Sequence, residues 1–162
     1  MDASTAAGVG RIVSLQRSGG GVPKLPVPSA EITERGLEGD VQANLKHHGG
    51  PDRALCLFSA EIIAALRAQG HPIVPGAVGE NVTIAGLDWT LLVPGARLRL
   101  GDEALIEVTS YTKPCFKIRS CFADEDVSRL DQRANPGSSR LYARVLAPGR
   151  VAAGDAVRLV AG

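Results

Sequence analysis

Short apolar runs separated by glycine and proline make up most of the chain, and this pattern predicts strands rather than long helices. The 19 glycines and 10 prolines are spread along the whole length, which favours many short strands. The predicted strands are residues 9–15, 54–58, 80–84, 96–100, 104–109, 141–146 and 156–160. Seven or so short strands favour a mainly β fold that closes into a barrel, because closure removes exposed strand edges.

Helical insertions and loops interrupt this strand pattern. Residues 60–69 predict a helix with Ser59 as its N-cap, and residues 114–133 are expected to be mostly helical. Prolines restrict residues 23–28 to an edge strand or an extended loop. Residues 36–50 predict a long loop, a kind of segment that usually carries function or disorder.

Length, charge and cysteine content narrow the class of protein. The 162 residues favour one domain, residues 1–162. The formal net charge of +1 argues against a strongly basic nucleic-acid surface, and no apolar run approaches the length of a membrane span. No signal peptide is visible, and three cysteines at irregular spacing suit a reducing compartment. The sequence therefore predicts a cytoplasmic domain with no nucleic-acid or membrane partner.

Cys115 is the candidate reactive thiol. Pro114 suits the first helical position, which would place Cys115 in the first turn, where helix N–H groups lower a thiol pKa. Lys113, Lys117 and Arg119 crowd the same helix end, and a thiolate or a bound anion would offset their repulsion. A free cysteine is also commonly a small buried hydrophobe, and the local sequence leaves these two interpretations level.

The other two cysteines have different settings. Cys56 lies inside an apolar run without a neighbouring charge, which favours core packing. Cys121 follows Cys115 by six positions, so the two side chains would project apart on a continuous helix. We therefore expect no redox pair between them.

Two polar segments have the composition of functional loops, but neither matches a motif that specifies one ligand. Residues 47–53, His-His-Gly-Gly-Pro-Asp-Arg, let the backbone approach a ligand but match no zinc pattern, and a tight turn explains them equally well. Residues 75–81 form a glycine-rich turn that ends in Glu80 and Asn81, which could anchor a loop or bind an amide-rich heterocycle.

Arg140, Tyr142 and Arg144 alternate along one predicted strand. A period of two puts all three side chains on one face of the strand. Two guanidinium groups and a phenol on one face could hold a phosphate, and a solvated outer face is the alternative.

Three of these segments, in this order and spacing, resemble the signature blocks of the MOSC domain family. They are residues 47–54, His-His-Gly-Gly-Pro-Asp-Arg-Ala, residues 79–81, Gly-Glu-Asn, and residues 114–115, Pro-Cys. Residues 36–40 and 141–151 extend the resemblance to nearly the full chain. The detail is most similar to the bacterial branch that detoxifies 6-hydroxylaminopurine.

The resemblance implies a fold, a cofactor and a set of site residues. The fold is a closed MOSC-type β-barrel, similar to the pyruvate kinase barrel, with a few short helices. The cofactor is the molybdenum cofactor (molybdopterin), and Cys115 matches the family cysteine that ligates molybdenum or carries sulfur. Pyridoxal phosphate binding is a further expectation that the resemblance carries. The expected cofactor-binding residues from the matched blocks are His48, Arg53, Glu80 and Asn81, to which electrostatics adds Lys113, Lys117 and Arg144.

The chain departs from the family pattern in two places. Relatives often have Pro-Arg-x-Pro-Cys, where this chain has Tyr-Thr-Lys-Pro-Cys at residues 111–115, so the arginine is absent and Lys113 replaces it only in part, without its bidentate fork. Relatives of the named branch usually continue into a helical segment that pairs with redox partners. Because this chain ends at Gly162, we expect a separate protein to deliver electrons.

Two function classes remain open. The first is an oxidoreductase that reduces a small N-hydroxylated base or amidoxime, with Cys115 as the molybdenum ligand. The second is a non-catalytic sulfur carrier or cofactor-handling module that uses Cys115 as a persulfide or as a cofactor ligand.

Overall fold

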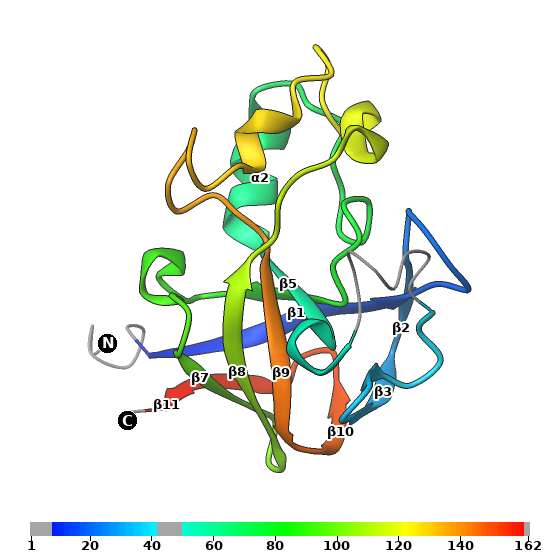
Figure 1. The fold of residues 1–162 in the computed structure, drawn as a ribbon, viewed down its shortest axis with the longest axis vertical. Helices are drawn as coiled ribbons and strands as arrows, with labels where there is room; N and C mark the ends of the chain where they lie inside the picture. The colour runs from blue at the N-terminus through cyan, green and yellow to red at the C-terminus, as the bar shows by residue number, and fades with distance from the viewer. Residues whose placement is uncertain (1–7, 42–49, 161–162) are drawn as a thin grey trace.

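The apolar runs form a mainly β fold in the computed structural model, which describes residues 8–41 and 50–160. Seven strands close into a barrel in the order β11-β7-β8-β9-β5-β6-β1, and pairing between β1 and β11 joins the two ends (Figure 1). The pair β5–β6 is parallel, whereas the other neighbouring strands in the barrel are antiparallel. The strands are β1 (Val9–Arg17), β5 (Leu55–Ser59), β6 (Val82–Ala85), β7 (Arg97–Leu100), β8 (Ala104–Tyr111), β9 (Leu141–Ala147) and β11 (Ala156–Val160). The closed barrel expected from the sequence is confirmed.

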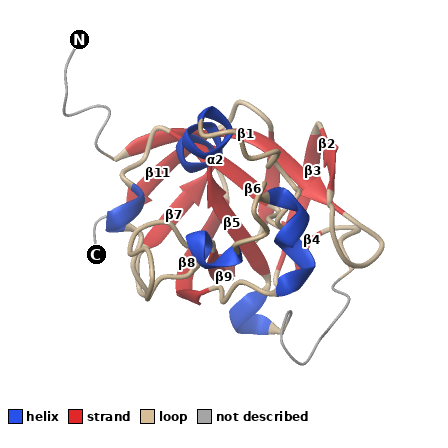
Figure 2. Ribbon diagram, turned by 90° about the horizontal axis from the view of Figure 1, so that it is seen from above, coloured by secondary structure: helices blue, strands red, loops and turns tan. Residues whose placement is uncertain are grey.

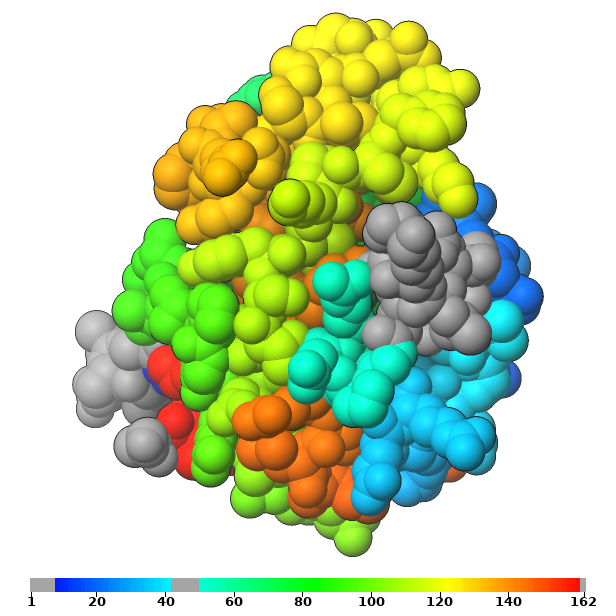
Figure 3. All heavy atoms as spheres, in the orientation of Figure 1, coloured from blue at the N-terminus to red at the C-terminus, as the bar shows by residue number. Residues whose placement is uncertain are grey.

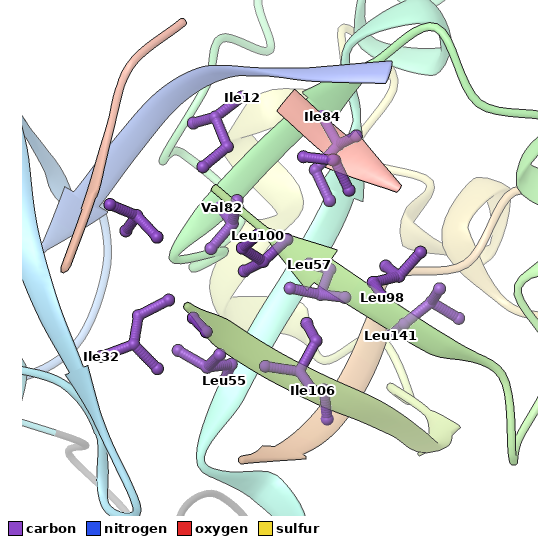
Figure 4. Close-up of a cluster of buried hydrophobic side chains, with 14 of the residues drawn as sticks. Ile12, Ile32, Leu55, Leu57, Val82, Ile84, Leu98, Leu100, Ile106 and Leu141 are labelled. Carbon is purple, nitrogen blue, oxygen red and sulfur yellow. The ribbon is translucent and has the colours of Figure 1, made fainter. Parts of the chain in front are cut away.

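Alternating side chains divide each strand between the barrel interior and its outside. Leu55 and Leu57 on β5 point into the core, and the register sets Cys56, which lies between them, opposite Tyr142 on β9. Cys56 and Tyr142 therefore face outward on the same side of the sheet. The interior is filled by aliphatic side chains from every barrel strand, among them Ile12, Val82, Ile84, Leu98, Leu100, Ile106 and Leu141 (Figure 4).

A smaller sheet extends the core beside the barrel. It pairs β10 (Gly149–Ala152), β3 (Ser29–Thr33) and β4 (Gly36–Leu37), while β2 (Leu25–Val27) pairs only with β1 as an edge strand. The expected edge strand in residues 23–28 is thus present. β3 and β4 were not predicted, because β3 holds only two core side chains, Ala30 and Ile32, and β4 falls inside the predicted loop.

A second apolar core lies at one end of the barrel, under α2 (Ala60–Ala68) (Figures 1 and 2). The helix begins as predicted, because the Ser59 hydroxyl accepts a hydrogen bond from the Ile62 N–H at 3.2 Å. Phe58 points out of the barrel into this second core. The core also contains Ile63, Leu66, Ile73, Val78, Ile118, Cys121, Phe122 and Leu130.

The helix expected over residues 114–133 is wrong. The segment forms two short 3₁₀ helices, η3 (Phe116–Cys121) and η4 (Val127–Leu130), and two others lie elsewhere, η1 (Pro51–Arg53) and η2 (Trp89–Leu91). Aspartate side chains compete for the backbone between η3 and η4, since Asp124 accepts from the Asp126 N–H and Asp126 accepts from the Ser128 N–H. Glu125 between them has a φ of 60°, which an α-helix cannot contain.

Replacing Leu57 by alanine should destabilise the protein by about 2–5 kcal/mol, because the fully buried side chain would leave a cavity in the barrel core. Leu25→Ala is the matched control, since 65% of the Leu25 side chain is exposed, and it should cost well under about 1 kcal/mol. Urea unfolding of both variants measures the difference. Equal losses of stability would contradict the placement of β5.

Candidate functional site

An open cleft lies on the outside of the barrel, where β5 and β9 meet the segment that follows β8. It is open to solvent, and residues from several separate segments of the chain line it. Its polar lining comes from Lys24, Arg53, Asn81, Cys115, Lys117 and Arg140. Figure 3 shows the turquoise segment after residue 50 and the yellow-green segment that follows β8, with orange atoms of β9 between them.

Cys115 lies on the wall of this cleft and is partly exposed. It occupies the N-cap position of η3 with an extended backbone, φ −126° and ψ 163°. The expectation that Cys115 sits in the first turn of a long helix is therefore wrong. Because η3 is a short 3₁₀ helix, the argument from the macrodipole of a long helix no longer applies.

The two other thiols are buried. The Cys56 sulfur lies 3.9 Å from the Thr112 hydroxyl on the cleft wall, and burial raises the pKa of the Cys56 thiol. The Cys121 sulfur lies 3.6 Å from the Ala77 carbonyl oxygen in the second core, where burial likewise raises its pKa. Cys56 and Cys115 both line the cleft, but Cys115 is the more exposed of the two, since Cys56 is buried.

Asn81 ties three parts of the cleft wall together. Its side-chain oxygen accepts the Cys56 N–H at 3.0 Å, and its side-chain nitrogen donates to Asp40 at 3.0 Å and to the Gln16 carbonyl at 3.3 Å. Asp40 also forms an ion pair with Lys24 at 2.6 Å, and both side chains are almost fully buried. Sequence reasoning missed Lys24 and Asp40 as site residues, and only the Asp40 position within a family-like block gave a signal.

Glu80 lies behind the cleft rather than on its surface. Its side chain is fully buried, and one carboxyl oxygen accepts the Thr83 hydroxyl at 3.0 Å, while the other has no partner among the described residues. Burial raises the pKa of Glu80 to about 7, although N–H groups and the charge of Arg140 act in the opposite direction. Contact between Glu80 and a ligand in the cleft is therefore not supported by the geometry.

Arg53 and Tyr142 form one side of the cleft. The Arg53 guanidinium lies over the Tyr142 ring at 5.3 Å from its centre, a cation–π arrangement. Burial raises the pKa of Tyr142 to about 12, so its phenol keeps its proton at neutral pH.

The remaining predicted residues separate into cleft and non-cleft positions. Lys117 is exposed at the cleft, whereas exposed Lys113 does not line it, and His48 lies outside the described residues. Arg144 shares the outer face of β9 with Tyr142, as the period of two predicts, but it pairs with Glu107 away from the cleft. Glu107 also pairs with Arg97 at 3.0 Å, so Arg144 shares its carboxylate partner with a second arginine.

Arg140 is a second cleft cation, besides Lys24, that the expected cofactor-binding residues did not include. Its side chain is only 4% exposed, and its Nε atom has no hydrogen-bond partner among the described residues. The alternation with Tyr142 was its only signal in the sequence. With Lys24, Arg53 and Lys117 it gives the lining four cations. Of these four, Lys24 is paired with the carboxylate of Asp40. The cleft therefore favours an anionic ligand.

The described residues contain neither a cluster of metal-binding side chains nor a helix that could span a membrane. Within residues 8–41 and 50–160, no three histidine, cysteine, aspartate or glutamate side chains are grouped so that they could hold a metal ion. No helix in the same ranges has the length and apolar character of a membrane span.

Comparison with known proteins identifies relatives of this chain. The family model of the MOSC domain matches residues 44–158. YiiM of Escherichia coli is 40% identical over 133 residues, which cover 80% of this chain and 58% of YiiM. The uncharacterized protein YflK of Bacillus subtilis is 37% identical over 142 residues, which cover 86% of this chain and 63% of YflK. The chain thus spans about three fifths of the length of these two relatives.

A fungal protein and two crystal structures are also similar to this chain. A protein named Reductase from Gibberella moniliformis is 30% identical over 129 residues, which cover 77% of this chain and 22% of that protein. The crystal structure of E. coli YiiM superposes with a TM-score of 0.68 at 30% identity, covering 94% of this chain and 70% of that chain. YiiM from Geobacillus stearothermophilus gives 0.71 at 25% identity, covering 94% and 75%.

Glu80→Gln should change how stability depends on pH. With a pKa raised from 4.5 to about 7, folded Glu80 holds a proton that the unfolded chain releases. Its contribution is therefore fully favourable below pH 4.5 and is lost progressively as the pH rises to about 7. Relative to the wild type, the glutamine variant should gain roughly 3 kcal/mol of unfolding free energy between those limits. Urea unfolding across this range measures the gain, and a constant difference would contradict it.

Proposed function

This chain belongs to the MOSC domain family, and from that premise we propose that its cleft binds the molybdenum cofactor with Cys115 as a ligand of molybdenum. The observation that carries the proposal is the convergence of the family blocks. Arg53, Asn81 and Cys115 come from three separate blocks of the sequence, and all three line the same cleft. The accessible thiol among the three cysteines is the one that the family pattern selects.

The donors in the cleft fit the proposed cofactor. A thiol is a soft ligand suited to a transition metal, and the cofactor's own sulfur atoms would complete a coordination sphere that the described side chains do not provide alone. The cationic lining and the unpaired, buried Nε of Arg140 suit a phosphate group. The same chemistry would accept another anionic cofactor, which is why pyridoxal phosphate is a useful competitor in binding assays.

Each residue would have a defined part in holding the cofactor. Cys115 would supply the protein sulfur, and Lys117 at the cleft edge would neutralise negative charge. Asn81 would act indirectly, since its amide already bonds to Cys56, Asp40 and Gln16 and so fixes the wall behind the ligand. Arg53 and the protonated Tyr142 would form a firm side wall that excludes water from the bound ring system.

The reaction that we propose is reduction of a small N-hydroxylated base or amidoxime. The bound cofactor would supply the redox chemistry, and the protein would supply binding, orientation and electrostatics. The similarity to a fungal protein named Reductase supports a reductive role. Electrons would come from a separate redox protein, and free thiols suit a reducing, cytoplasmic setting.

A sulfur-carrier function is the second candidate, because the partly exposed Cys115 thiol would also suit a persulfide. Molybdenum analysis separates the two. Protein made in a host that produces the cofactor should contain molybdenum and reduce an N-hydroxylated base if the first function holds. Metal-free protein with a persulfide on Cys115 would support the carrier.

Cys115→Ser should abolish bound molybdenum and reductase activity without unfolding the barrel. The change removes a soft sulfur ligand and leaves a hard, mostly protonated hydroxyl of similar size. Because Cys115 is partly exposed, the melting temperature should change by less than about 3 °C. Cys121→Ser is the matched control, since it affects a buried thiol outside the cleft and should reduce stability rather than metal content per folded molecule. A Cys115→Ser protein that keeps its molybdenum and its activity would refute the ligand role.

Lys117→Gln should weaken cofactor binding by roughly 5- to 10-fold, the effect of losing one partly screened charge at the cleft edge. Arg144→Gln is the comparison, because Arg144 pairs with Glu107 away from the cleft and its loss should leave affinity within about twofold. Titration of cofactor-free protein with released cofactor, followed by fluorescence, measures both. A larger effect for Arg144 than for Lys117 would show that the cleft is misassigned.

A further inference from the structure

The side chain of Arg140 connects two segments that lie far apart in the sequence. Its Nη1 atom donates to the Val78 carbonyl oxygen at 2.7 Å, and its Nη2 atom donates to the Lys113 carbonyl oxygen at 3.2 Å. Val78 directly precedes the Gly-Glu-Asn block, and Lys113 precedes Pro114 and Cys115. One buried guanidinium therefore bonds to both segments that form the cleft around the thiol.

The backbone next to Arg140 holds the same segment. The Arg140 carbonyl oxygen accepts the Thr112 N–H at 2.9 Å, and the Ser139 hydroxyl donates to the Thr112 carbonyl at 3.2 Å. Cys115 has no side-chain bond that caps η3, and its carbonyl accepts the Ile118 N–H at 3.2 Å. The position of Cys115 is consequently set on its N-terminal side by the contacts of residues 139–140.

The charge of Arg140 also acts on the cleft. Both hydrogen bonds go to neutral carbonyl groups, and in the described parts of the chain no ion pair to a carboxylate balances the guanidinium. Burial raises the pKa of Glu80 to about 7, although the charge of Arg140 acts in the opposite direction, so Glu80 is only partly ionised at neutral pH and offsets the Arg140 charge only in part. The Arg140 charge is therefore available to a ligand that approaches Cys115.

We propose that Arg140 is a positioning residue for Cys115, which fixes the thiol segment against the Val78 turn and makes the cleft at Cys115 selective for anionic over neutral reagents. The proposal extends the proposed function, on which it rests only for the role of Cys115 as a ligand. Lysine at this position would keep the charge, but a single ammonium group lacks the planar fork that reaches two carbonyls at once.

Alkylation of cofactor-free protein tests this role separately from molybdenum binding. The wild type, Arg140→Gln and Arg140→Lys are treated at low salt with iodoacetate, which is anionic, and with iodoacetamide, which is neutral, and rates at Cys115 are obtained by peptide mapping. Arg140→Gln should lower the iodoacetate-to-iodoacetamide rate ratio about 3- to 10-fold, because a weakly screened charge is removed. Arg158→Gln, which removes an exposed arginine on β11 outside the cleft, should leave the ratio unchanged.

The lysine variant separates charge from position. It should keep most of the ratio but raise both rates several-fold, because a single ammonium group cannot bond to the Val78 and Lys113 carbonyls together, so the Cys115 segment is held less firmly. An unchanged ratio in Arg140→Gln would overturn the proposal, even if the melting temperature falls. If that variant does not fold, unchanged rates for both reagents in Arg140→Lys would overturn it instead. Either result would leave the molybdenum proposal to stand or fall on metal analysis.

Discussion

Strand β1 closes the barrel, because it pairs with β11 and with β6, the two strands that would otherwise end the barrel sheet. Val9 to Arg11 pair with β11, and Arg11 to Leu15 pair with β6, with a register shift between Ile12 and Ser14. Gly10 permits this close approach, since a Cβ atom there would lie 2.2 Å from the Ala85 carbonyl oxygen. Without this double pairing, β11 and β6 would have open edges and the core would be exposed.

Closure also builds the wall of the cleft. It brings β6 beside β1 and parallel to β5, so that Asn81, just before β6, bonds to Gln16 on one side and Cys56 on the other. Asp40 and Lys24 then join Asn81 in a buried polar cluster whose charges are paired. One wall of the cleft is therefore the outer surface of the barrel. The opposite wall is the segment that carries Cys115, which Arg140 holds through its hydrogen bond to the Lys113 carbonyl. Placing the reactive group on a connecting segment beside a fixed wall is typical of functional sites.

The elements predicted correctly are those with strong local signals. The run around Leu57 and the Ser59 cap identify β5 and α2 from neighbouring residues alone, and the order of the family-like blocks identified the family and its barrel. The failures need tertiary information. The aspartates at 124 and 126 break the expected helix through their own backbone contacts, and Arg144 obeys the predicted alternation on a part of β9 that the cleft does not reach. Lys24 belongs to no sequence pattern, and the alternation of Arg140 with Tyr142 does not show that Arg140 is buried, because partners far away in the chain decide the burial of both residues.

The proposed function requires a bond between the Cys115 sulfur and molybdenum. X-ray absorption at the molybdenum edge measures that bond directly. Protein isolated from a host that makes the cofactor would be compared with the same cofactor released from the protein into solution. We expect the protein-bound spectrum to contain one more sulfur neighbour of molybdenum than the spectrum of the released cofactor. Identical sulfur coordination in the two samples would contradict the central claim, because the metal would then be held without Cys115.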